Sequence, residues 1–213
     1  MGDTAALALA TLFATISPID VAAIYAGITL ESSIRERRRM AVRGVLIATG
    51  VLVVFALIGD WLLNALGISL AALRTAGGIL LLLMGLDMVF ARSSANTPTE
   101  AEEEEALGKN DVSVFPLALP LIAGPGSIGA IILLMAQSNS NVFEQATVMG
   151  MLGVVMVLTL VCLLAATQLT RVLGLTGMQV ITRVMGVLLC ALAVQFVFDG
   201  VAESGLLAML EPR

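Results

Sequence analysis

The chain has 213 residues, of which 59% are hydrophobic and 13% are charged, and its mean hydropathy is +1.02. These values exclude a soluble globular domain and predict packed transmembrane helices. The net charge of −5 comes largely from one loop and implies no partner by itself, and we expect no nucleic-acid partner. The absence of histidine removes the commonest metal ligand and proton carrier.

The remaining composition points away from an enzyme. Cys162 and Cys190 stand singly in apolar runs and are interpreted as small buried hydrophobic residues rather than redox or metal groups. Any proton chemistry must therefore use carboxylates, and we expect no catalytic residues, no metal and no bound cofactor.

Six apolar segments are separable along the chain, and each can cross roughly 30 Å of hydrocarbon at about 1.5 Å per residue. The fold class is therefore predicted to be all-α with six transmembrane helices. The first segment is expected to be a retained span, because no basic region precedes it. The segments lie near residues 4–30, 43–63, 71–91, 113–136, 145–168 and 178–199.

The first segment is interrupted near its middle by Ser17, Pro18, Ile19 and Asp20. Proline breaks the hydrogen-bond ladder of a helix, and a carboxylate near the bilayer centre costs about 2.5–3.5 kcal/mol on insertion scales. One interpretation is that Asp20 caps the half-helix that begins at Pro18. The other is that Asp20 binds a substrate ammonium, or a coupling proton or sodium ion.

Basic residues predict the orientation in the membrane. Five arginines lie between the first two spans, in a stretch (residues 31–43) that is expected to be a loop, whereas residues 64–70 and 137–144 contain no basic residue. The positive-inside rule then places the arginines in the cytoplasm and both termini outside. The five are Arg35, Arg37, Arg38, Arg39 and Arg43.

Residues 92–112 contain five glutamates and predict a solvated cytoplasmic linker, with a regulatory role as the alternative. This linker divides the chain into two predicted halves, residues 1–91 and 113–213, each with three spans.

A second break lies in the fourth segment, at Gly124, Pro125, Gly126, Ser127 and Ile128. Glycines at such a break let a ligand approach the backbone closely. Two prolines that merely kink their helices are the alternative, because membrane spans tolerate proline. The other prolines of this segment, Pro116 and Pro120, are expected to bend its entry.

The two halves resemble each other. A shift of 107 superposes the two breaks, and a shift of 108 superposes Gly78-Ile79-Leu80-Leu81 on Gly186-Val187-Leu188-Leu189. Because each half has three spans, the second half must be inverted relative to the first, as in many secondary transporters. The two half-helix N-termini would then face each other near mid-membrane, where they suit an anionic group such as a carboxylate.

Four polar residues recur near the ends of the third span of each half and are interpreted as snorkelling residues or as a gating set. They are Arg74, Asp87, Arg183 and Gln195.

Three segments of the sequence resemble the MarC family of integral membrane proteins, also known as small neutral amino acid transporter-like proteins. They are residues 115–128, residues 73–80, and Arg183-Val184-Met185-Gly186 with Val194-Gln195-Phe196. The resemblance implies six spans in a bacterial or archaeal cytoplasmic membrane and transport of small neutral amino acids such as glycine and alanine. The chain departs from the family pattern at the first break, where Ser17 replaces the usual asparagine and Asp20 is added.

The sequence therefore predicts a secondary transporter of small neutral amino acids in a prokaryotic inner membrane. The substrate would contact both breaks, residues 17–20 and 124–128, and the expected partners are a zwitterionic substrate and the lipid bilayer. A homo-oligomer is compatible with the sequence. The alternatives are a membrane scaffold or assembly factor with structural breaks, and an exporter of another small metabolite.

Overall fold

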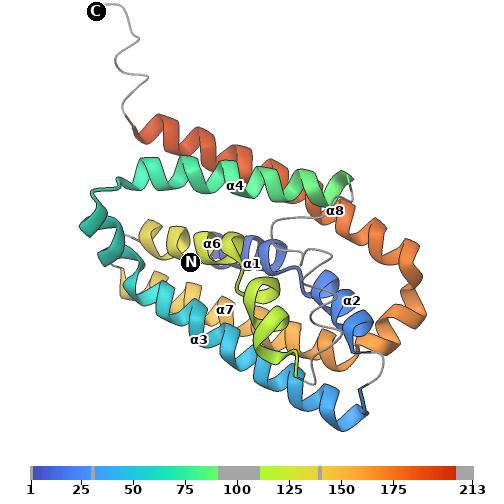
Figure 1. Cartoon of the computed structure of the whole chain (residues 1–213). Coiled ribbons are helices and arrows are strands. Elements are labelled where there is room, and N and C mark those ends of the chain that lie inside the picture. The colour runs from blue at the N-terminus through green and yellow to red at the C-terminus, as the bar shows by residue number, and fades with distance from the viewer. Residues whose placement is uncertain (1, 30–31, 91–110, 139–140, 205–213) are drawn as a thin grey trace, which may run out of the picture.

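The computed structural model describes residues 2–29, 32–90, 111–138 and 141–204, and all its regular elements in these ranges are helices (Figure 1). Most of the predicted acidic linker lies outside the described residues. The elements are α1 (Gly2–Ile16), α2 (Pro18–Ile28), α3 (Ile34–Leu66), α4 (Leu70–Phe90), the π-type helix η1 (Ser113–Ile122), α6 (Pro125–Gln137), α7 (Val142–Leu164) and α8 (Ala166–Glu203).

By length and composition, 5 described helices can cross a membrane, counting α1 and α2 as one span from Thr4 to Ile28. The number rises to 6 when η1 and α6, which meet at an angle of 55°, are counted as one bent span. The predicted all-helical membrane protein is confirmed at this level.

Two connections that we expected to be irregular are helical instead. Residues 34–43 form the first turns of α3, because Ser33 accepts from the Glu36 N–H while the Glu36 carboxylate accepts from the Ser33 N–H. This capping box satisfies two backbone donors, and arginine is a good helix former. Likewise, α8 begins at Ala166 and bends at Gly174, which has a φ of 62°.

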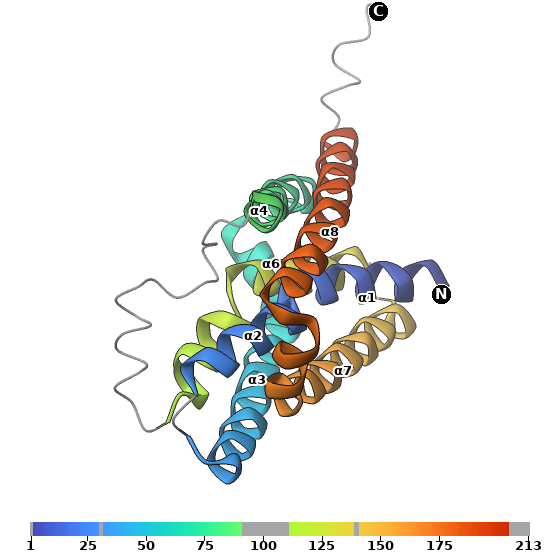
Figure 2. The same ribbon diagram turned by 90° about the vertical axis from the view of Figure 1, so that its right-hand side faces the viewer.

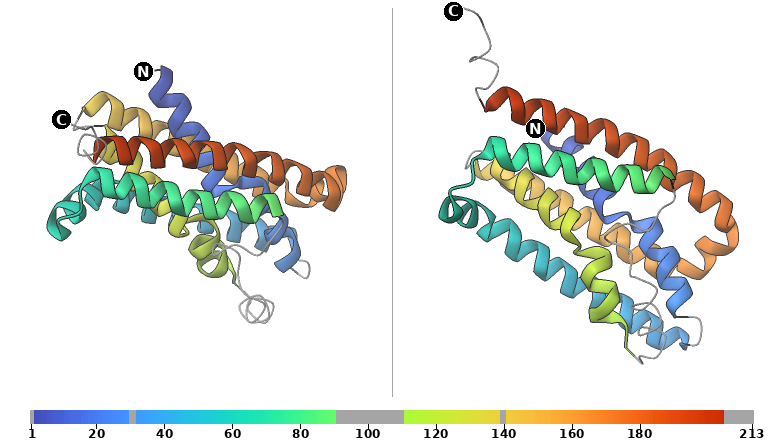
Figure 3. Two further views of the ribbon diagram at one scale, coloured as in Figure 1. Left: turned by 90° about the horizontal axis from the view of Figure 1, so that it is seen from above. Right: turned by 45° about the horizontal axis from the view of Figure 1, so that its top comes forward.

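Helices α4 and α8 lie side by side on one side of the other helices (Figures 2 and 3). Their contact is formed at glycines. A Cβ added at Gly85 would come within 3.0 Å of the Gly186 carbonyl oxygen, and one added at Gly200 within 2.9 Å of the Ala71 carbonyl oxygen. The pair is antiparallel and packs backbone to backbone, which only small residues allow.

The remaining helices share a separate core. Leu12, Tyr25, Leu52, Ile122 and Leu152 are nearly or fully inaccessible and bring α1, α2, α3, η1 and α7 together. In chain order, α1, α2, α3 and α4 of the first half correspond to η1, α6, α7 and α8 of the second. The contacts follow this correspondence: α1 packs on α7 and η1 packs on α3, while α2 packs on α8 and α6 packs on α4.

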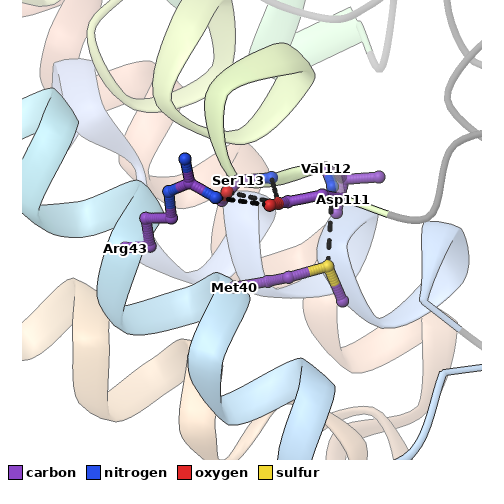
Figure 4. A network of polar contacts seen from close by, with 5 residues as sticks. All are labelled: Met40, Arg43, Asp111, Val112 and Ser113. Carbon is purple, nitrogen blue, oxygen red and sulfur yellow. Dashed lines mark hydrogen bonds and ion pairs between the residues drawn. The ribbon is translucent and has the colours of Figure 1, made fainter.

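Asp111 anchors the start of η1 to α3 (Figure 4). Its carboxylate accepts from Arg43 Nη1 at 2.6 Å and from the Ser113 N–H at 3.0 Å, and the Ser113 hydroxyl also donates to it. The Val112 N–H lies 3.5 Å from the Met40 sulfur. Hydrogen bonds from Ser113, with a smaller contribution from Arg43, hold the pKa of Asp111 below its ordinary value.

Candidate functional site at the helix breaks

The first break occurs at a single residue. Ser17 has a φ of 48° and is the only non-glycine residue with positive φ in the described ranges. Pro18 then occupies the first turn of α2, where its missing N–H costs no helical hydrogen bond. The Ser17 side chain does not cap the helix backbone but donates to the carboxylate of Asp20 instead.

Asp20 joins the first break to the last helix. Its second carboxylate oxygen accepts a hydrogen bond from the hydroxyl of Thr182 in α8. The side chain is partly buried, and hydroxyl donors on both oxygens offset part of the cost of placing a carboxylate there. Asp20 therefore lies in the first turn of α2, as the capping interpretation requires, and also contacts the other half of the chain.

A small cavity of about 70 Å³ adjoins Ser17 and Asp20. It is also lined by Met84 and Met88 of α4 and by Leu121 of η1. The volume accommodates water or a small ion but is well below the roughly 300 Å³ of drug-sized pockets.

The second break is organised differently. Gly124 precedes α6 in extended conformation, and Pro125 is exposed at its first turn. Ser127 is fully buried, and its hydroxyl lies 2.8 Å from the Ile122 carbonyl oxygen and 3.0 Å from that of Gly124. The hydroxyl thus satisfies backbone acceptors that the break leaves open.

Leu121 of η1, which precedes the second break, lines the small cavity beside Ser17 and Asp20. Among the described residues that line the small cavity, none belongs to the predicted second half-site. Gly124 and Gly126 are buried, and Ile128 is partly buried. A shared site formed by residues 17–20 and 124–128 remains a prediction.

The four polar residues near span ends have different environments. Arg74 pairs with Glu203 of α8 at 2.9 Å, and its Nε is buried without a hydrogen-bond partner within the described part of the chain. Gln195 is exposed and donates to Asp199 at 2.7 Å. Asp87 is partly buried and Arg183 is exposed.

Sequence reasoning missed Thr182, Met84 and Met88. A signal for Thr182 was present, because a shift of 108 aligns it with Arg74, a residue already singled out. The methionines carried no such signal in an apolar chain. No group of three or more Cys, Asp or Glu side chains in the described ranges could hold a metal ion.

Comparison with known proteins agrees with the helical membrane architecture. The family model described as "MarC family integral membrane protein" matches residues 3–204. No solved structure matches the chain.

Similar proteins occur in archaea and bacteria. The UPF0056 membrane protein MJ1677 of Methanocaldococcus jannaschii is 36% identical over 195 residues, which cover 92% of this chain and 94% of that protein. A UPF0056 membrane protein of Archaeoglobus fulgidus is 33% identical (91% and 90% covered), and UPF0056 membrane protein YhcE of Escherichia coli is 31% identical (89% and 88% covered). With a family model that spans almost its whole length, the chain belongs to the MarC family of integral membrane proteins.

Proposed function

We propose that the protein is a secondary transporter of small neutral amino acids that works by alternating access around its two broken helices. The observation that carries the proposal is the position of Asp20, a carboxylate at a helix break, bonded across to Thr182 and beside a cavity. A carboxylate inside a membrane span is costly and is usually kept for a substrate or ion.

An inverted repeat of three plus three helices is part of the proposal, and the α4–α8 contact supports it. A Cβ at Gly78 would lie 2.7 Å from the Ala193 oxygen and 2.9 Å from the Val197 nitrogen. A Cβ at Gly186 would lie 2.9 Å from the Gly85 oxygen and 3.0 Å from the Val89 nitrogen. Each residue in the second set follows from the first by a shift of 108, which is the shift that the sequence repeat requires.

A second structural correspondence supports the same repeat. The positive-φ glycines of the described ranges are Gly67, after α3, and Gly174, within α8. They are 107 residues apart, which is the shift that superposes the two breaks. A glycine with positive φ thus precedes the third span of each half, at ψ 25° for Gly67 and ψ 174° for Gly174, so the two positions correspond although their turns differ.

The chemistry at the breaks suits a zwitterion. The first-turn N–H groups of α2 and α6 and their positive dipole ends would hold a carboxylate. Asp20, with Ser17 and Thr182, would hold the ammonium group or a coupling proton or sodium ion. The family resemblance and this complementarity support the proposed substrate class.

We place the protein in a prokaryotic inner membrane with both termini outside. The support is the arginine-rich start of α3, which the positive-inside rule assigns to the cytoplasm.

Uptake and counterflow of labelled glycine, alanine and serine in proteoliposomes, with and without pH and sodium gradients, tests the proposal. We expect saturable flux that depends on one of the gradients. Absence of flux for all three, with folded protein inserted in both orientations, would contradict the proposal and favour the scaffold.

A further inference from the structure

Two larger cavities lie at opposite ends of the helical bundle. The arginine-end cavity, of about 450 Å³, is lined by residues that include Tyr25, Thr29, Arg37 and Thr167. The opposite-end cavity, of about 550 Å³, is lined by residues that include Asp60, Ala136 and Gln145. Neither includes a residue of the breaks.

The two cavities are counterparts under the proposed repeat. The first is bounded by the end of α2, the start of α3, the end of α7 and the start of α8. Exchanging the halves converts this set into the end of α6, the start of α7, the end of α3 and the start of α4, which bound the second cavity. Thr29 corresponds to Ala136 at a shift of 107, and Arg37 corresponds to Gln145 at a shift of 108.

The distance between the cavities fits a membrane. Arg37 and Asp60 both lie on α3, and at about 1.5 Å per residue they are separated by about 35 Å along its axis. This exceeds the roughly 30 Å of hydrocarbon and stays below the 40–45 Å of a whole bilayer. With α3 spanning the bilayer, as the proposed function requires, the two cavities would open toward opposite membrane surfaces.

In the arginine-end cavity, Arg37 forms hydrogen bonds to residues on two other sides of the cavity. Arg37 Nε donates to the Thr29 carbonyl oxygen at 2.7 Å, and Arg37 Nη1 donates to the Thr167 hydroxyl at 2.9 Å. The Arg37 carbonyl oxygen accepts from the Tyr25 hydroxyl. Arg37 thus connects the end of α2 to the start of α8, whereas glutamine at the equivalent position 145 has a shorter side chain without charge.

We propose that the two cavities are the access chambers of the transported solute on opposite sides of the membrane, and that the bridge formed by Thr29, Arg37 and Thr167 closes the first chamber. The inference rests on the proposed alternating-access function. Because Thr167 is exposed, the bridge can exchange with water when α2 and α8 separate. Opening one chamber would close the other, because α3 and α7 bound both chambers and a tilt of these two helices moves their two ends in opposite directions.

Cysteine labelling tests this inference without a substrate. In full-length protein with Cys162→Ala and Cys190→Ala, single cysteines are introduced as Ala26→Cys in the arginine-end cavity or Ala136→Cys in the opposite-end cavity. Labelling rates with a membrane-impermeant maleimide are measured in proteoliposomes of known orientation, with the reagent on the side that each cavity faces.

Arg37→Gln installs the residue found at the equivalent position 145. We expect it to raise the labelling rate of Ala26→Cys by at least about fivefold and to lower that of Ala136→Cys by a similar factor. Arg38→Gln is the control, because Arg38 lines the same cavity with the same charge but does not bridge α2 and α8. Thr167→Val removes the acceptor at the other end of the bridge and should change both labelling rates in the same way as Arg37→Gln. It therefore provides a second test if Arg37→Gln folds poorly.

The reciprocal change is decisive. If Ala26→Cys becomes more reactive while Ala136→Cys stays unchanged, the bridge is only a local contact and the inference is wrong. Unchanged labelling at both positions, or an equal effect of Arg38→Gln, also overturns it. If the two labelling rates change in opposite directions but no amino acid flux is detected, the result supports the two access chambers and contradicts only the proposed substrate.

Discussion

Thr182 donates a hydrogen bond to Asp20 across 162 residues of sequence, so the last helix of the chain contacts the break in its first span. The contact involves a carboxylate that stands at the break of an otherwise apolar span. It makes Asp20 and its two hydroxyl donors the first residues to test.

Asp20→Asn should abolish transport or uncouple it from the driving gradient. The amide keeps the size of the side chain but removes its charge, so transport should fall about tenfold or more, as for loss of a charged hydrogen-bond partner. Counterflow and gradient-driven uptake in proteoliposomes measure the change. Asp199→Asn, which alters an i,i+4 contact with Gln195, is the control and should transport normally. Unchanged coupling in Asp20→Asn would assign Asp20 to helix capping alone.

Thr182→Val and Thr182→Ser separate the hydroxyl from the shape of the side chain. Valine matches threonine in shape but cannot donate to Asp20, so it should lower the free energy of unfolding by about 1.5–3 kcal/mol and reduce transport. Serine retains the donor and should stay closer to the parent protein in both measurements. Denaturant titration in detergent and proteoliposome flux give the two readouts. Equal behaviour of the two variants would mean that the hydrogen bond contributes nothing.

Gly78→Ala and Gly186→Ala should destabilise the α4–α8 pair by similar amounts. Each added methyl group would lie less than 3 Å from a backbone atom of the facing helix, and such overpacking costs about 1–3 kcal/mol. Gly150→Ala is the matched control, since its Cβ meets nothing within 4 Å and alanine favours a helix over glycine by up to about 1 kcal/mol. Thermal unfolding in detergent ranks the three. A large difference between the first two variants would count against the proposed repeat.

The Asp111 contact should make stability depend on pH. Because the pKa of Asp111 is lower in the folded protein, the contact stabilises the fold above the pKa of the unfolded chain, and this contribution is lost as the pH falls through the folded value. Asp111→Asn should therefore destabilise the protein at pH 7, by less than about 1 kcal/mol for so exposed a pair, and the difference should shrink toward pH 3. Arg43→Gln should remove the ion pair and leave the bonds to Ser113. A pH-independent difference would refute the assignment.

Local features of this fold could be predicted from the sequence. Pro18 and Pro125 begin helices because proline is tolerated in the first turn, and the apolar runs identify the spans. The helical extension of α3 was missed because the density of arginines suggested a loop, although Ser33 and Glu36 carry the spacing of a capping box.

Contacts between distant segments could not be predicted. The choice of Thr182 as the partner of Asp20, and of Glu203 as the partner of Arg74, depends on how α8 packs against α2 and α4. The role of the Ser127 hydroxyl depends equally on backbone geometry, because its acceptors are carbonyl groups that become available only when the helix breaks.

The glycine contact between α4 and α8 also constrains biosynthesis. Gly78 and Gly85 of α4 find their packing surface on α8, which the ribosome makes about 100 residues later. During insertion, α4 is therefore in the bilayer before its partner helix is made, and these glycines are uncovered. A chain that stops before α8 exposes them to any neighbouring helix with a small-residue surface. Premature termination should yield nascent chains that associate with one another or are degraded, even though their first spans are intact.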